Sequence, residues 1–200
     1  DLQPPARPAY LQGTLKVKPV TPDELKLRTD IDADEVNVLA ISVTNEIFIR
    51  KRHDAVMKVS NGVVEPDVAR DLLYITVVER YGKTNNRPTG IVSGFHLESG
   101  ALATSTSPDD NNIVCVGTNS EDMAIAINRI IEGGGGQAVV NNGEILEFLE
   151  LPIAGIVSDI EPEEMAGFEE RLDAAARSLG CDLPWPLMYM FVLSITAIPD

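Results

Sequence analysis

The chain has 200 residues, and 44% of them are hydrophobic, which is enough to bury the core of one globular domain. Its formal net charge of −15 argues against a nucleic-acid partner, because such binding depends on lysine and arginine side chains that displace counterions. Since there are two cysteines and no export signal near residue 1, we expect a cytoplasmic domain without a disulfide framework or a membrane partner.

The first residues differ in composition from the rest. Residues 1–13 are rich in proline and show no hydrophobic periodicity, which is typical of a linker or the end of an upstream domain. Residues 14–200 are then expected to form one domain. Residues 21–25 read Thr-Pro-Asp-Glu-Leu and predict a single capped helical turn, because proline suits the first helical position and acidic side chains are stabilised near a helix N-terminus.

Several short apolar runs predict strands joined by tight turns. Strand candidates cover residues 36–43, 47–50, 55–59 and 72–79. Two Asn-Gly pairs, at residues 61–62 and 142–143, lie between apolar runs and predict hairpins, because the turns of such hairpins need residues that tolerate a positive φ. Hairpins imply antiparallel pairing of the flanking strands.

Two amphipathic helices are predicted in the second half of the chain. Thr118 and Glu121 form a Ser/Thr-x-x-Glu capping box before a helix that extends to Ile131. Pro162 opens a second helix over residues 163–179, with apolar residues on one face. The apolar run at residues 187–198 is too short to cross a bilayer and is predicted to be a buried strand or strand pair. Hairpins with interspersed helices indicate an α+β layered domain with a largely antiparallel or mixed sheet.

Three short patterns have an ordinary structural interpretation beside a functional one. The basic cluster at residues 50–53 is either an anion site or a solvated loop or sheet edge, and we favour the second. The four glycines at residues 133–136 follow a helix instead of opening one, so they predict a helix stop rather than a phosphate-binding loop. Cys115 lies inside an apolar run, which is typical of a small buried residue.

A resemblance to a known family rests on short motifs that occur in the same order. Residues 112–123 read Asn-Ile-Val-Cys-Val-Gly-Thr-Asn-Ser-Glu-Asp-Met and resemble a signature of the C-terminal domain of adenine deaminase, within the amidohydrolase superfamily. Further motifs of that family are matched at residues 18–24, 71–73, 77–80, 94–95, 100–101, 151–159 and 186–188. The resemblance covers about residues 13 to 199.

The loop before this signature departs from the family pattern. Where the family has His-Asp-Ser-His-Asn, this chain has Pro108, Asp109, Asp110, Asn111 and Asn112. Both histidines are missing, and neither proline nor asparagine replaces imidazole as a ligand. Asp109 and Asn112 remain as the candidate catalytic residues. Asp109 and Asp110 are candidate ligands of a hard cation, although Ser-Pro-Asp-Asp-Asn is also ordinary turn chemistry.

The resemblance implies a complete hydrolase of purine metabolism that converts adenine and water to hypoxanthine and ammonia. Its Mn²⁺ or Fe²⁺ would sit in an upstream amidohydrolase barrel, and a homodimer is a further partner that the resemblance allows. This chain has only His53 and His96, which form no His-x-His pair and cannot build a site of several imidazoles. Cys115 and Cys181 lack the Pro-Cys-x-x-Cys spacing of a cytidine-deaminase-type zinc site.

The chain is therefore predicted to be the non-catalytic C-terminal domain of such an enzyme, with no cofactor of its own. One alternative is a stand-alone binding or structural module derived from that domain. Another is a domain with its own hydrolase activity, but no Ser or Cys is spaced from a His in a recognisable nucleophile pattern.

Overall fold

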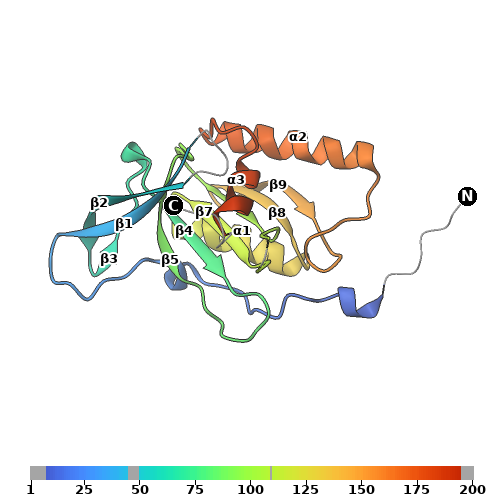
Figure 1. Cartoon of the computed structure of the whole chain (residues 1–200), viewed down its shortest axis with the longest axis horizontal. Helices are drawn as coiled ribbons and strands as arrows, with labels where there is room; N and C mark the ends of the chain where they lie inside the picture. The colour runs from blue at the N-terminus through green and yellow to red at the C-terminus, as the bar shows by residue number, and fades with distance from the viewer. Residues whose placement is uncertain (1–7, 45–49, 109, 195–200) are drawn as a thin grey trace, which may run out of the picture.

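The computed structural model describes residues 8–44, 50–108 and 110–194, and within them a nine-stranded sheet is flanked by helices (Figure 1). The strands are β1 (Glu35–Val43), β2 (Arg50–Ser60), β3 (Val63–Val64), β4 (Leu73–Val78), β5 (Thr89–Ser93), β6 (Ala101–Thr104), β7 (Ile113–Gly117), β8 (Gly136–Asn141) and β9 (Glu144–Glu150). The α-helices are α1 (Ser120–Glu132), α2 (Pro162–Ser178) and α3 (Pro186–Leu193), and the 3₁₀ turns are η1 (Ala9–Leu11), η2 (Pro22–Leu25) and η3 (Val68–Arg70).

The sheet is mixed, with the order β3-β2-β1-β5-β4-β7-β6-β8-β9. Among the described strands only the β1–β5 pair is parallel, and the other neighbours are antiparallel. The two predicted hairpins are confirmed, because Asn61 and Asn142 have φ angles of 53° and 51° and each is followed by a glycine of positive φ. This architecture confirms the predicted α+β layered domain.

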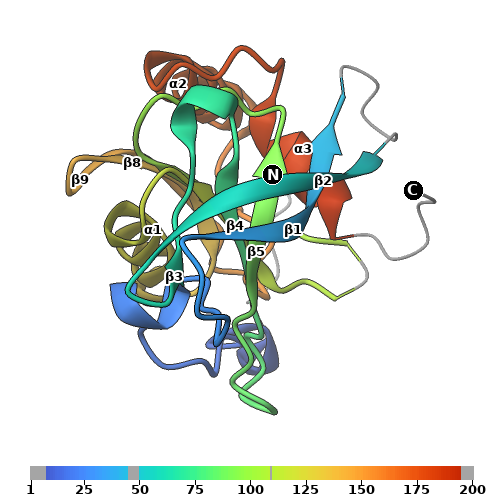
Figure 2. The same cartoon turned by 90° about the vertical axis from the view of Figure 1, so that its left-hand side faces the viewer.

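Helices cover both faces of the sheet, so its central strands are buried on two sides. On one face Met123 and Ile127 of α1 pack in a core that includes Cys115 of β7. On the other face Leu172 of α2 and Met190 of α3 pack in a second core. Figure 2 shows α1 on one side of β4 and α3 on the other. Neighbouring residues of β7 alternate between the two cores, as successive side chains of a strand must. The buried thiol of Cys115 matches its prediction as a core residue, and burial raises its pKa.

The basic cluster at residues 50–53 lies in β2 itself rather than in a loop. It pairs with β1 on one side, whereas β3 pairs only with Val59 and Ser60. Residues 51–53 are exposed, so the interpretation as a solvated sheet edge is confirmed for this part of β2. Of the strand predicted at residues 47–50, residues 47–49 lie outside the described part of the chain.

The start of η2 follows the predicted chemistry, whereas the start of α1 differs in its capping residue. The capping box of Thr21 and Glu24 is present, with the Thr21 amide donating to Glu24 Oε2 at 2.8 Å. The N-cap of α1 is Asn119 and not Thr118: Asn119 Oδ1 accepts from the Asp122 amide at 2.8 Å. Thr118 lies one residue before this cap, and its amide and its hydroxyl both donate to the Gly100 carbonyl, at 2.9 and 3.2 Å.

The prediction of a strand at residues 187–198 was wrong for the residues of this run that the structure describes, since Pro186–Leu193 form helix α3. Pro186 occupies the first helical turn, and the leucines and methionines that follow are strong helix formers. The run is apolar on nearly all sides, so its sequence carries no periodicity that separates a helix from a strand. In the described residues no helix is both long and apolar enough to cross a membrane.

Candidate functional site

Four strands bring the candidate loop together with other loops at one end of the sheet. β4 and β6 end there and β7 and β8 begin there, since Val78 pairs with Ile113 and Thr104 pairs with Val114 and Gln137. We call this region, made of residues 79–85, 105–108, 110–112 and 133–135, the loop end. It holds Asp110 and Asn112, the two predicted site residues that the structure describes.

The described part of the loop at residues 105–112 is a turn closed by its own side chains. Asp110 Oδ1 accepts from Ser107 Oγ at 2.8 Å and from the Asn112 amide at 3.1 Å, and its Oδ2 accepts from Asn112 Nδ2 at 2.9 Å. This is the turn chemistry that competes with cation binding as an explanation for these residues. Asn112 Oδ1 also accepts a 3.4 Å hydrogen bond from the Arg80 amide, which ties the loop to the end of β4. Asp109 lies outside the described residues.

The described residues offer no metal centre at this loop. No group of three or more His, Cys, Asp or Glu side chains in the described part of the chain is placed to hold a metal ion. The catalytic role of Asp109 and Asn112 and the cation role of Asp109 and Asp110 therefore stay predictions.

Glu79 organises the neighbouring loop. Its Oε2 accepts from the amides of Lys83 and Thr84 at 2.9 and 3.0 Å, and its Oε1 accepts from the Tyr81 amide at 2.6 Å. Backbone donors, that of Thr84 first, hold the pKa of the Glu79 carboxyl below its usual range. Tyr81 in turn donates from its hydroxyl to the Asp110 carbonyl at 2.8 Å, so the two loops are fastened to each other.

Arg80 is the functional candidate that the sequence analysis missed. Its side chain is only 3% exposed, and Nε and Nη1 are buried without a hydrogen-bond partner among the described residues. The guanidinium carbon lies 5.1 Å from the centre of the Tyr81 ring, a cation–π distance. The available signal in the sequence was a basic residue two positions after the apolar strand β4, within the family motif at residues 77–80.

Ser105 joins the loop end to the segment after β9. It is fully buried; its hydroxyl donates to the Gly155 carbonyl at 2.6 Å and accepts from the Gly136 amide at 2.8 Å. Gly155 has a φ of +75° and lies against Arg80. The motifs at residues 77–80 and 151–159 thus meet at this loop, although they are far apart in sequence.

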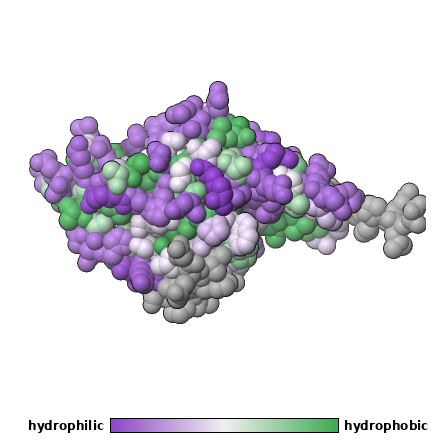
Figure 3. Space-filling view, turned by 90° about the horizontal axis from the view of Figure 1, so that it is seen from above, coloured by the Kyte–Doolittle hydropathy of each residue, from purple (hydrophilic) through white to green (hydrophobic). Residues whose placement is uncertain are grey.

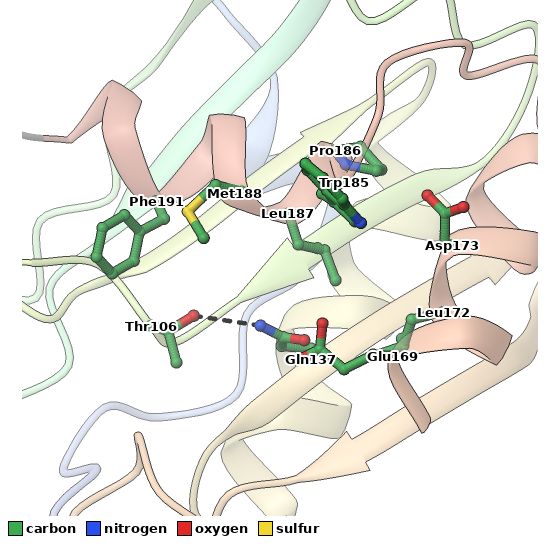
Figure 4. A pocket seen from close by; sticks show the side chains of 10 residues that line it. All are labelled: Thr106, Gln137, Glu169, Leu172, Asp173, Trp185, Pro186, Leu187, Met188 and Phe191. Atoms are coloured by element: carbon green, nitrogen blue, oxygen red, sulfur yellow. Dashed lines mark hydrogen bonds between the residues drawn. The ribbon is translucent and has the colours of Figure 1, made fainter. Parts of the chain in front are cut away.

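A pocket of about 290 Å³ opens beside the loop end, between α2 and α3 (Figure 4). It is lined by Thr106, Gln137, Glu169, Leu172, Asp173, Trp185, Pro186, Leu187, Met188 and Phe191. On the side of the pocket that faces the sheet, Gln137 Nε2 donates a 3.4 Å hydrogen bond to Thr106 Oγ1. The rim is apolar, with Trp185 69% and Met188 47% exposed. The face seen in Figure 3, by contrast, is mostly hydrophilic with smaller hydrophobic areas.

The two histidines lie in separate environments. His53 lies on the exposed part of β2, and its Nδ1 is 3.0 Å from Oγ of Ser42 on the neighbouring strand β1. His96 Nδ1 lies 2.5 Å from Asp182 Oδ1, and its Nε2 lies 3.6 Å from Asp71 Oδ2. The hydrogen bond to Asp182, followed by the charge of Asp71, raises the pKa of His96. Neither imidazole forms a nucleophile pair with the cysteines, which are free and buried.

Comparison with known proteins identifies the family. The chain matches the adenine deaminase C-terminal domain over residues 48–200. It is 57% identical over 200 residues to adenine deaminase 4 of Rhizobium meliloti (strain 1021), covering 100% of this chain and 33% of that protein. It is also 49% identical to adenine deaminase 1 of Desulfotalea psychrophila and 43% identical to adenine deaminase 1 of Latilactobacillus sakei subsp. sakei, covering all of this chain and 34% of each relative.

The chain therefore spans about a third of the length of these relatives. The matched region contains β2 and every later element described above, including the loop end and the pocket. A match over most of the chain, with the order of motifs found in its sequence, shows that the chain belongs to the adenine deaminase C-terminal domain family.

Proposed function

We propose that this chain is the non-catalytic C-terminal domain of an enzyme that hydrolyses adenine to hypoxanthine and ammonia. The observation that carries the proposal is the match of the whole chain to one third of proteins named adenine deaminase. In this proposal an upstream amidohydrolase barrel performs the chemistry and is the main partner of the domain. Two free cysteines are compatible with a cytoplasmic location for the enzyme.

The metal ions belong to the upstream part in this proposal. Mn²⁺ or Fe²⁺ would there activate a water molecule for attack on the purine ring. The described residues of this chain do not fit such a centre, because Asp110 is engaged by Ser107 and Asn112, and His53 and His96 have partners elsewhere. No step of the reaction is therefore assigned to a metal held by this chain.

The part of the domain nearest the substrate is proposed to be the loop at residues 105–112. Supporting this, the loop is fastened at several points: to Tyr81 by a hydrogen bond, to Arg80 through Asn112, and to Gly155 through Ser105. A loop held this firmly can present side chains to a neighbouring domain with little loss of conformational entropy. Asp109 and Asn112, which match the family pattern, are the proposed contacts.

The first experiment compares ammonia release from adenine, with Mn²⁺ supplied, by the longer native gene product and by this chain alone. Activity in the longer protein only is the expected result. If neither is active, the stand-alone binding or structural module becomes the better explanation. Light scattering on the longer gene product tests the homodimer.

A second experiment tests the loop in the longer protein. Asp109→Asn is expected to lower turnover without lowering the unfolding temperature, because it removes a charge from the proposed contact surface. Asp32→Asn is the control, since Asp32 is an exposed carboxylate in a loop outside the loop end. Equal turnover of the two variants would remove the proposed role of Asp109.

A further inference from the structure

The pocket between α2 and α3 combines apolar walls with carboxylates on one side. Leu187 and Met188 of α3 and the preceding Trp185 form much of the wall, and Glu169 and Asp173 come from α2 (Figure 4). Glu169 and Asp173 are four residues apart on one helix, so they lie on the same helical face. The pocket is accordingly an apolar cavity with a negatively charged side.

Arg177 neutralises only one of the two pocket carboxylates. Its Nε donates a 2.8 Å hydrogen bond to Asp173 Oδ2. Asp173 Oδ1 has no hydrogen-bond partner among the described residues, but it is buried and is not open to the pocket. Glu169 is not paired with a cation among the described residues, so the pocket keeps a net negative charge.

Trp185 is held beside the Asp173 carboxylate in an unusual backbone conformation. Its φ and ψ are 52° and 63°, in the left-handed region that residues other than glycine rarely occupy. Its indole is 69% exposed and lines the pocket instead of packing in the core. Strain that places a large aromatic ring at a pocket is a feature of ligand-binding sites. Tryptophan is also the best aromatic partner for an organic cation.

We propose that this pocket binds a guanidinium or alkylammonium group carried on a short apolar stem. The charged end lies between the carboxylates of Asp173 and Glu169, while the stem contacts Leu187 and Met188. A guanidinium is the best fit, because its planar fork both stacks on the ring of Trp185 and bonds a carboxylate. A volume of about 290 Å³ is at the small end of ligand pockets, which suits one such group.

Two kinds of ligand carry such a cationic group: a free small molecule, or an arginine side chain of another polypeptide segment. The inference does not depend on the proposed deaminase function, because it rests on this pocket alone. It can therefore be tested on the 200-residue chain without any activity assay.

The test uses the fluorescence of Trp185, which is the only tryptophan in the chain. Pentylguanidinium is titrated into the protein at low ionic strength, and its neutral analogue pentylurea is titrated in parallel. The two probes share a shape and differ in charge. Pentylguanidinium is expected to give a saturable change in emission, with an affinity about tenfold or more above that of pentylurea.

Three variants place the binding in the pocket. Asp173→Asn and Glu169→Gln should each weaken pentylguanidinium binding, the first by about tenfold because it removes the charge nearest the probe. Glu170→Gln is the matched control, because Glu170 is a carboxylate on the same helix that does not line the pocket, and it should bind as the parent does. Unchanged far-ultraviolet circular dichroism shows that each variant is folded.

A capped arginine tripeptide distinguishes the two sources. Saturable binding of pentylguanidinium that Asp173→Asn weakens supports a free small cation. Binding of the tripeptide alone, with the same dependence on Asp173, supports a docked arginine side chain. The proposal is overturned if neither probe saturates, if pentylurea binds equally well, or if Asp173→Asn and Glu170→Gln have the same effect.

Discussion

The guanidinium group of Arg80 lies against the backbone of Gly155, with almost no space between them. A β-carbon on Gly155 would overlap Arg80 Nη1 and would lie 2.7 Å from Leu15 Cδ1. Gly155 also has a φ of +75°, which side chains of L-residues rarely adopt. Glycine is therefore required here both by the backbone conformation and by the buried arginine.

Replacing Gly155 tests this contact. Gly155→Ala should lower the free energy of unfolding by about 2–4 kcal/mol, because it adds steric overlap to backbone strain. Gly143→Ala is the control: Gly143 has a φ of +83° but nothing within 4 Å of an added β-carbon, so only strain of about 1 kcal/mol is expected. Urea unfolding of both variants measures the difference. Similar losses in the two variants would contradict a tight contact with Arg80.

The unpaired nitrogens of Arg80 give a second prediction. Removing one partner of a buried ion pair typically costs about 3–5 kcal/mol, whereas an unpaired buried charge can be removed at little cost. Arg80→Met keeps most of the side-chain volume and should change the stability of this chain by less than about 1 kcal/mol, or raise it.

Arg80→Ala separates packing from charge, because it also removes the buried aliphatic stem. This variant should be clearly less stable than Arg80→Met in the same urea titration. If Arg80→Met itself loses as much as a broken buried ion pair, the guanidinium has a partner in solution and the prediction fails.

Local chemistry in the sequence was enough to predict the turns and two of the α-helices. The Asn-Gly pairs at residues 61–62 and 142–143 need positive φ wherever they occur, and Pro162 and Gly180 bracket α2 by their own backbone preferences. These features depend on neighbours in sequence. The order of the strands and the parallel β1–β5 pair depend on contacts between distant residues, and no local pattern encoded them.

The same distinction applies to the site. The loop residues that differ from the family pattern were found from sequence, because they interrupt a motif. The burial of Arg80 could not be predicted from the sequence, because it depends on a contact with Gly155, which belongs to a different and distant motif. The pocket was also missed, because α3 was predicted as a strand and the pocket forms only where α3 faces α2.

The start of α1 gives a third prediction, on the identity of its cap. Asn119 accepts from the Asp122 amide, so Asn119→Ala should cost about 1 kcal/mol of stability. Asn119→Ser keeps an acceptor without setting a second carboxylate against Asp122, whose Oδ2 accepts from Asn119 Nδ2 at 3.1 Å, and should lose much less. Thr118→Val removes the 3.2 Å hydrogen bond to the Gly100 carbonyl and the 3.3 Å hydrogen bond from Asn119 Nδ2, and should cost less than Asn119→Ala. A larger loss for Thr118→Val in urea unfolding would favour the capping box predicted from sequence.

His96 gives the last prediction, a pH dependence. Its pKa is raised first by the hydrogen bond to Asp182; burial opposes this rise, and the charges of Asp71 and Asp182 add to it. A pKa raised in the folded state means that the folded state binds the proton more tightly than the unfolded state. The stabilisation is therefore fully present below the unfolded pKa of about 6.5 and is lost as the pH rises through the folded pKa. The side chain of His96 is 53% exposed, so the effect should be under about 1 kcal/mol.

The measurement is urea unfolding of the parent, His96→Asn and Asp182→Asn from pH 5.5 to 8.5. Asparagine is chosen at residue 96 because His96 has a φ of +55°, which asparagine tolerates. At low pH the parent should be more stable than either variant, and the difference should shrink as the pH rises. Asp182→Asn keeps the imidazole and the charge of Asp71 but removes the hydrogen-bonded carboxylate, so it should lose less of the pH dependence than His96→Asn does. A difference that grows with pH would show that the pair stabilises the neutral imidazole instead.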